Sequence, residues 1–270
     1  SDLAPRIFDP LDPARGPRDW RVGAPRWFVS GIFDTGYLYV RPRFSAGYGR
    51  PHYAWAGFEA NPLVSGEGAG GYFGLRGALP RIDLRVGARY FHTFDRAFLC
   101  PTIGFDRADR CQTQPALEFY DREDIESRIG PQSIYLTFES ELTVNLPLGP
   151  GKVVSELALS AVTGVPDGYF VFEETIKIAI EPPWVWRGRL GYAFPVDREK
   201  TTQIGVVGEV VHAVEREVVA IRGGITGRVR LYANLEARGI FVPLLHSKDE
   251  IGAAGADTFL LGIRYRWASD

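Results

Sequence analysis

Residues 134–145 read IYLTFESELTVN, and this stretch decides the fold. Apolar side chains at Ile134, Leu136, Phe138 and Leu142 alternate with polar ones such as Glu139. A period of two residues places the two kinds of side chain on opposite faces of a β-strand. The stretch is about twice as long as an ordinary strand of five or six residues. It therefore predicts a long strand with one apolar and one polar face.

The same alternation recurs from about residue 27 onward, and helical periodicity is hard to find. About twelve runs show it: 36–49, 52–65, 69–79, 81–97, 132–147, 152–164, 170–181, 184–196, 201–213, 217–228, 232–243 and 257–267. Turn-forming residues separate most runs, as in Gly149-Pro150-Gly151 and Glu181-Pro182-Pro183. The pattern predicts an all-β antiparallel protein of about twelve strands, within a range of 10 to 14.

Alternation by itself also fits a soluble β-sandwich. Three features favour a transmembrane barrel instead. The runs have the length of tilted membrane strands, about 9 to 11 residues or more. Aromatic residues such as Tyr37, Trp184 and Trp186 stand near strand ends, where a membrane barrel carries its aromatic girdles. Of 31 basic residues only four are lysines, which suits a confined polar face where guanidinium groups pair with carboxylates.

The last run carries a family resemblance. Leu261-Gly262-Ile263-Arg264-Tyr265-Arg266-Trp267 resembles the C-terminal signal of bacterial outer-membrane β-barrel proteins, with Gly262, Tyr265 and Trp267 in its characteristic places. Two features depart from that signal: Leu260 replaces a usual polar residue, and three residues follow Trp267. The resemblance implies a porin-like outer-membrane location, contact with membrane lipids and recognition by the barrel-assembly machinery.

Composition narrows the function further. The net charge is −2, so no basic field predicts nucleic-acid binding. Mean hydropathy is −0.09 and the longest apolar runs span only a few residues, far below the ~20 that a membrane helix needs. The chain begins Ser1-Asp2 and lacks methionine, which suggests an exported protein whose signal peptide is absent from this sequence.

Two domains of unequal character are expected. Residues 1–26 hold five prolines among Asp and Arg and predict an extended arm, and residues 27–270 form the barrel. Such an arm is compatible with disorder, with plugging the barrel or with touching another envelope protein. The 98–131 connection is a second candidate contact surface.

Cys100 and Cys111 lie in that connection, without the partners of a zinc site, and predict a disulfide in an oxidising compartment. With the twelve runs above, this loop falls at the periplasmic end, although a disulfide loop is more natural outside. Two explanations remain open. Either the twelve runs lack a strand near Trp27 and have a compensating error later in the chain, or residues 166–183 include loop.

The alternation also predicts which charges face the lumen. The basic set is Arg41, Arg43, Arg85, Arg89, Arg187, Arg189, Arg222, Arg238, Arg264 and Arg266, and the acidic set is Glu59, Glu139, Glu141, Glu156, Glu173, Glu209 and Glu236. Glutamates cluster on the middle runs and arginines on the last and first. We expect an acidic wall facing a basic wall, with a field across the lumen.

Three functions fit these features. The first is a narrow passive channel for small polar or ionic solutes. The second is a barrel filled by its own ion pairs that serves as a docking component of an envelope-spanning motility or export machine. An outer-membrane hydrolase is the third, but no catalytic residue set, metal-ligand cluster or cofactor motif is found around His52, His92, His212 or His246. We therefore expect a protein that is not an enzyme.

Overall fold

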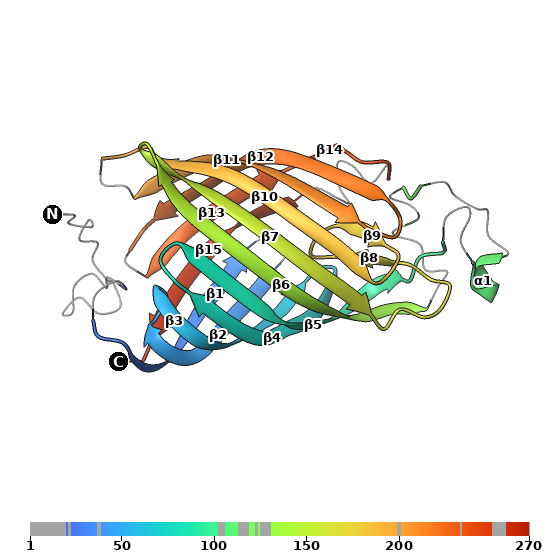
Figure 1. The fold of residues 1–270 in the computed structure, drawn as a ribbon, viewed down its shortest axis with the longest axis horizontal. Coiled ribbons are helices and arrows are strands. Elements are labelled where there is room, and N and C mark those ends of the chain that lie inside the picture. The colour runs from blue at the N-terminus through green and yellow to red at the C-terminus, as the bar shows by residue number, and fades with distance from the viewer. Residues whose placement is uncertain are drawn as a thin grey trace.

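The computed structural model describes residues 20, 23–36, 39–101, 106–112, 119–121, 124, 131–198, 201–232, 234–249 and 258–269. Among these residues, twelve antiparallel strands form a closed barrel, which confirms the fold expected from the alternation (Figure 1). The strands of the wall are β1 Arg26–Gly36, β2 Tyr39–Arg50, β3 Ala54–Ser65, β4 Gly68–Ala78, β5 Ile82–Ala97, β6 Gln132–Leu148, β7 Gly151–Thr163, β10 Trp184–Pro195, β11 Thr202–Ala213, β12 Val218–Arg230, β13 Leu235–Val242 and β15 Thr258–Ala268.

The barrel is closed between its first and last strands. β1 pairs with β15 in a register that runs from Ser30 opposite Ala268 to Gly36 opposite Gly262. β15 also pairs with β13, and β11 with β12, so the hydrogen-bonded circuit has no open edge. Closure of this kind satisfies the backbone of every wall strand without help from solvent.

Among the described residues, three short strands and one short helix are not part of the twelve-stranded wall. β8 Val171–Glu173 and β9 Ile178–Ile180 form a two-stranded sheet of their own. β14 Leu244–His246 adds to β12, and helix α1 Asp109–Gln112 lies in the 98–131 connection.

Two predictions about individual strands were wrong, and the two errors cancel. The run 170–181 was predicted to be a wall strand, but it folds into the β8–β9 hairpin. Its apolar residues occupy both parities, and both short strands are buried throughout, as a segment inside the barrel requires. The stretch 26–36 was not among the twelve predicted runs, although a missed strand near Trp27 was one of the two explanations left open for the position of the disulfide loop. It forms β1, whose exposed Trp27, Val29 and Phe33 follow the expected alternation.

This exchange moves the disulfide loop to the opposite end of the barrel. β1 and β15 place the start and the end of the wall together at one end, where the turns at 51–53, 79–81 and 149–150 are short (Figure 1). The 98–131, 164–183 and 243–257 connections lie at the other end. Short turns are periplasmic and long loops external in outer-membrane barrels. We refer to these as the inner and outer ends, and the disulfide loop belongs to the outer end.

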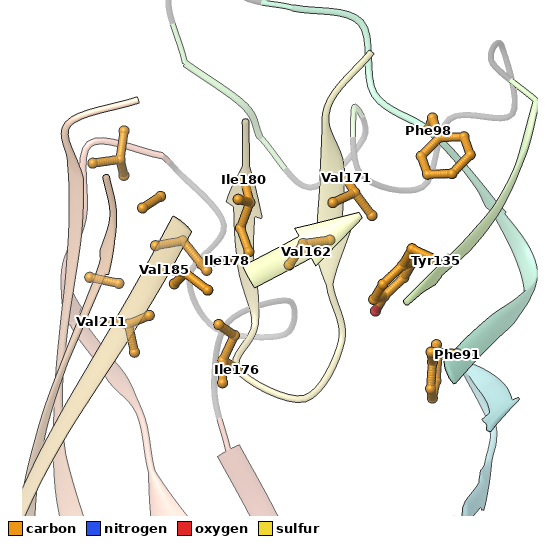
Figure 2. Packing of buried hydrophobic residues seen from close by; sticks show 13 residues of the cluster. Phe91, Phe98, Tyr135, Val162, Val171, Ile176, Ile178, Ile180, Val185 and Val211 are labelled. Atoms are coloured by element: carbon orange, nitrogen blue, oxygen red, sulfur yellow. The ribbon is translucent and has the colours of Figure 1, made fainter. Parts of the chain in front are cut away.

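The principal apolar core sits at the outer end of the interior (Figure 2). The hairpin contributes Val171, Ile176, Ile178 and Ile180, which pack against wall side chains including Tyr135. A smaller apolar cluster of Phe28, Trp55 and Ala78 lies at the inner end, and most of the remaining interior is polar.

One close approach in the wall depends on glycine. Gly74 of β4 lies opposite Gly87 of β5, and the Tyr72 ring lies over both. A Cβ at Gly74 would overlap the Tyr72 hydroxyl and come within 2.7 Å of the Gly87 Cα. The Arg85 guanidinium stacks 4.8 Å from the centre of the same ring. The glycine pair therefore makes room for an aromatic ring that supports a lumen arginine.

We expect Gly74→Val to destabilise the barrel by about 1–3 kcal/mol, because added methyl groups force Tyr72 from its position. Gly77→Val in the same strand is the matched control, since a Cβ there meets nothing within 4 Å. The measurement is the temperature at which the folded band converts to the unfolded band in electrophoresis. Equal midpoints for the two variants would contradict this account.

Candidate functional site in the barrel lumen

The predicted lumen residues of the wall strands do face the interior, where they line a cavity, form ion pairs or are buried. Glu173 is the exception, because it belongs to β8 rather than to the wall. Its carboxylate lies inside the barrel nonetheless, 3.5 Å from the Arg89 guanidinium of β5.

Arginines and carboxylates alternate around much of the interior. Glu139 lies 2.8 Å from Arg89 and 3.3 Å from Arg85. Glu141 then lies 3.1 Å from both Arg85 and Arg187. The chain of contacts continues through Glu156, Arg189 and Glu209 to Arg222, whose guanidinium is 2.7 Å from Glu209. Each of these carboxylates contacts two guanidiniums.

The opposite side carries an excess of arginine. Asp34 of β1 accepts hydrogen bonds from Arg43 at 3.1 Å, Arg264 at 2.9 Å and Arg41 at 3.4 Å. Glu236 of β13 is shared by four arginines, at 3.0 Å from Arg266, 3.5 Å from Arg238 and 3.8 Å from both Arg228 and Arg264. Six guanidiniums therefore share two buried carboxylates.

This arrangement corrects the expected pair of opposing walls. The glutamates of β6 and β7 are interleaved with Arg85, Arg89, Arg187 and Arg189, so they do not form an uncompensated acidic wall among the described residues. The basic side, in contrast, keeps a surplus of positive charge.

The described residues line two adjoining cavities inside the barrel. The larger has a volume of about 590 Å³ and is lined by eight arginines against five carboxylates. The smaller, of about 290 Å³, lies toward the inner end and is lined by Lys152, Arg189, Arg228 and Arg238 against Glu156. The cavities share Glu156, Arg189, Thr226 and Arg238 in their linings, so they adjoin. The lumen is thus basic although the whole chain has a net charge of −2.

Sequence reasoning missed two residues of this set, Asp34 and Lys152. Asp34 was missed because residues 27–35 were not among the predicted runs, although its position in the alternation with Phe33 carried the signal. Lys152 falls on a predicted run with inward parity, which was enough to find it, and the same parity had predicted that Arg228 faces inward. The excess of charge over partners was not visible, because pairing depends on which strands become neighbours.

The β8–β9 hairpin closes the larger cavity at the outer end, where Thr175 and Ile176 line it. The Glu173 carboxylate accepts hydrogen bonds from the Thr175 hydroxyl at 2.7 Å and the Ile176 amide at 2.9 Å, which fixes the hairpin turn. Arg222 of the wall donates to the Lys177 carbonyl at 2.6 Å. The hairpin is therefore held by polar contacts at its turn and by apolar packing along its strands.

Glu174 of the same turn is buried and lies 2.6 Å from Arg96 and 3.1 Å from Lys177. Burial nevertheless raises the pKa of its carboxyl group, because the loss of hydration outweighs the attraction of Lys177 and Arg96 and the nearby Glu67 repels it further.

Arg216 joins the loops of the outer end. Its guanidinium, almost fully buried, forms two hydrogen bonds with Asp249 at 2.7 and 2.8 Å and donates to the Ala179 carbonyl of the hairpin at 2.9 Å. It also stacks 4.7 Å from the centre of the Tyr120 ring. One side chain thus contacts the 98–131 loop, the hairpin and the 243–257 loop.

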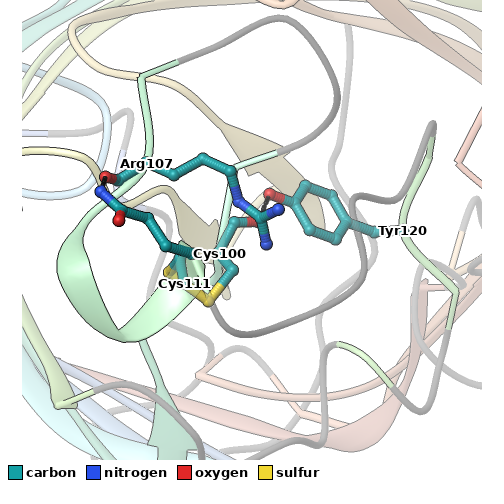
Figure 3. The surroundings of a disulfide bond; sticks show 5 residues. Cys100, Arg107, Cys111 and Tyr120 are labelled. Carbon is teal, nitrogen blue, oxygen red and sulfur yellow. Dashed lines mark hydrogen bonds between the residues drawn. A yellow bond between two sulfur atoms is a disulfide. The ribbon is translucent and has the colours of Figure 1, made fainter.

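The disulfide lies beside this contact (Figure 3). Cys100 and Cys111 are bonded as predicted, with Cα atoms 5.3 Å apart. The Tyr120 hydroxyl donates a hydrogen bond to the Cys100 carbonyl, and backbone bonds join Leu99 to Phe170 at the start of the hairpin. The disulfide loop and the hairpin are therefore parts of one closed assembly.

The outer surface of the wall is apolar. Exposed side chains on alternating positions include Val29, Phe33, Phe44, Phe58, Val64, Phe73, Leu75, Leu84, Val86, Phe138, Leu157, Leu159, Leu190, Ile204, Val206, Ile225, Leu261 and Ile263. A continuous apolar exterior around a charged interior is the reverse of a soluble protein and matches a barrel in lipid. The chain is an outer-membrane-type β-barrel.

The similarity of this chain to known proteins is distant. No protein-family model matches the chain, and no curated protein matches its sequence. Among solved structures, the chain is similar to the COG4313 outer membrane channel from Pseudomonas putida F1, with 13% identity, full coverage of both chains and a TM-score of 0.43. It is also similar to the NanC porin, with 9% identity over 90% of this chain and 98% of that one and a TM-score of 0.37. A third similar structure is an anion-selective porin from Comamonas acidovorans, with 11% identity over 90% and 100% of the chains and a TM-score of 0.35.

The C-terminal strand places its signal residues at the seam of the barrel. Trp267 pairs with Gly31, and a Cβ on Gly31 would overlap the Trp267 indole, so the indole covers the glycine. Gly262 pairs with Gly36, and Tyr265 with Phe33.

No group of three His, Cys, Asp or Glu that could hold a metal ion occurs in the described part of the chain, and none of its helices is long and apolar enough to span a bilayer.

We expect Asp249→Asn to loosen the outer loops, because it leaves the buried Arg216 charge without its partner. Breaking a buried pair in this way costs about 3–5 kcal/mol. The measurement is the rate of proteolysis of the outer loops in proteoliposomes. Asp197→Asn, in the exposed turn at the inner end, is the control. Equal protection of the 98–131 loop in both variants would contradict the role assigned to Arg216.

Because the pKa of Glu174 is raised, the stability of the hairpin in its buried position depends on pH. The protonated carboxyl group is favoured when the hairpin is buried. Its stabilising effect is therefore fully present below the ordinary glutamate pKa of about 4.3 and is lost as pH rises through the raised pKa. Amide-exchange protection of residues 171–180 should therefore fall across that window. Glu174→Gln should remove the dependence. Protection that increases with pH in the wild-type protein would show the opposite sign.

Proposed function

We propose that the chain is a narrow passive channel for small polar or ionic solutes in the bacterial outer membrane. The observation that carries this proposal is the pair of adjoining charged cavities inside a closed barrel, with volumes of about 590 and 290 Å³. A barrel of eight strands is filled by its side chains and one of sixteen encloses a wide channel, so twelve strands suit a narrow one. Ordered charges along such a lumen select solutes by sign and size.

The β8–β9 hairpin is the segment that opens and closes this channel. It stands across the outer end of the lumen between β5–β6 and β10–β12 (Figure 2). Burying one aliphatic side chain contributes about 1.5–3 kcal/mol, so Val171, Ile178 and Ile180 together hold the hairpin firmly. Conduction requires the hairpin to leave this position, and the closed arrangement dominates the population.

The same hairpin favours a second function. A barrel closed by its own chain, with its lumen arginines largely paired, suits a structural component that docks other envelope proteins. The 98–131 loop would provide the contact surface at the outer end. The arm at residues 1–26 would provide one at the inner end, although all of it except residues 20 and 23–26 lies outside the described residues.

For either function we propose that the barrel contacts membrane lipids through its apolar exterior. Gly262, Tyr265 and Trp267 would present it to the barrel-assembly machinery before the seam closes. The proposal assigns no catalytic residues and no cofactor.

Replacing residues 171–180 by a short Gly-Ser linker should open the outer end. We expect single-channel conductance in planar bilayers to rise at least several-fold over the wild-type protein, because the linker cannot replace the apolar contacts that close the lumen.

The control is Asp197→Ala at the inner end, which should leave the conductance at the wild-type level. A folded hairpin variant that stays electrically silent would sink the channel proposal and leave the docking function, to be pursued by crosslinking through the 98–131 loop.

A further inference from the structure

We propose that the smaller cavity is a binding site for a small organic anion with two or more carboxylate groups, held by Lys152, Arg228 and Arg238. The proposal rests on the channel function above and names its substrate class. Arg228 of β12 and Arg238 of β13 lie opposite each other on neighbouring strands, whereas Lys152 comes from β7, which β10 and β11 separate from β12. All three cations line the same 290 Å³ cavity.

These cations have no close carboxylate partner among the described residues. The Lys152 ammonium makes no ion pair there, and Arg228 donates a hydrogen bond to the neutral Gln203 side chain at 2.9 Å. Arg228 and Arg238 approach Glu236 only at 3.8 and 3.5 Å, and Glu236 is more closely engaged by Arg266 at 3.0 Å. The Arg238 contact is made through Nε, and 46% of its side chain is exposed to the lumen.

The carboxylate that lines the cavity is already engaged. Glu156 forms an ion pair with Arg187 and lies 3.7 Å from Arg189. It therefore balances the arginines of β10 and leaves the charges of Lys152, Arg228 and Arg238 to a ligand. Guanidinium groups bind carboxylates in a planar, two-pronged geometry, and the lysine adds a mobile point charge.

The rest of the lining selects an organic anion over an inorganic one. Val154, Val207 and Ile240 contribute apolar surface between the charged groups. A small carbon skeleton fills this surface, whereas a bare inorganic anion leaves it in contact with water. The volume admits a compact di- or tricarboxylate and is at the lower limit for drug-sized ligands, about 300 Å³.

The site also lies on the path of a permeating solute. Because the two cavities share Arg189 and Arg238, an anion that enters the larger cavity reaches the smaller one by exchanging one guanidinium for the next. A channel conducts when binding is favourable for entry and weak enough for release. The expected affinity is therefore modest.

Citrate is the probe, and titration calorimetry of the refolded full-length protein in detergent micelles measures its binding. We expect Lys152→Gln and Arg238→Gln each to weaken citrate binding by about tenfold, since one charge-assisted contact is worth roughly 1.5–3 kcal/mol at most. Lys248→Gln is the matched control, because it makes the same chemical change on an exposed side chain at the outer end. It should bind citrate as the wild-type protein does.

Sulfate tests whether the site prefers an organic anion to an inorganic one. We expect sulfate to bind at least several-fold more weakly than citrate. Equal binding of sulfate and citrate, absent citrate binding, or citrate affinity that Lys152→Gln leaves unchanged would each overturn the inference.

Citrate block of the current through the hairpin variant separates the two proposals. Current without block or binding refutes the anion site alone. Citrate binding in micelles without any current refutes the channel and leaves the site standing.

Discussion

The structure depends on the pairing of every backbone amide and carbonyl of the wall in a medium that offers no water. Lipid imposes this constraint, and only a sheet that closes on itself satisfies it with strands. The seam between β1 and β15 is where the constraint is met, because these strands come from opposite ends of the chain. Once the seam is closed, the side chains of each wall strand point alternately toward the lipid and toward the lumen.

The charged side chains of the lumen lie closer together than those of an open protein surface. Twelve strands bring guanidiniums and carboxylates within 3 to 4 Å of one another, and most of them find partners on an adjacent strand. Arginine suits this arrangement because its planar group contacts several carboxylate oxygens at once. Pairing is uneven, however. Asp34 and Glu236 are each shared by several arginines, and the positive surplus appears on the cavity surface beside them. The ion pairs of the interior and its surplus of positive charge thus come from the same set of side chains.

The hairpin changes what such a lumen can do. A segment buried on both faces requires an apolar setting, and the wall provides the larger one at the outer end, with Phe91, Tyr135, Val162 and Val211. The interior consequently has a large apolar part at the outer end, a charged part, and a small apolar cluster of Phe28, Trp55 and Ala78 at the inner end. Arg216 bonds both to the hairpin and to the 243–257 loop, and the disulfide lies in the 98–131 loop beside it, so the hairpin and the surface loops are in direct contact.

The sequence by itself determined the class of fold and the inward parity of the charged residues, because a strand's side chains alternate whatever its neighbours are. The predicted number of wall strands was right only because one missed strand offset one wrongly assigned strand. It also determined the disulfide, which needs only two cysteines in one loop. Only the tertiary structure decided that 26–36 is a wall strand and 170–181 is not. Both stretches are apolar, and only closure of the barrel shows which of them has a hydrogen-bonded place in the wall. The partners of each charge were likewise undetermined, since Glu236 meets Arg228 and Arg266 only after β12, β13 and β15 become neighbours. The balance of paired and surplus charge in the lumen is a property of the closed sheet, and alternation along one strand does not predict it.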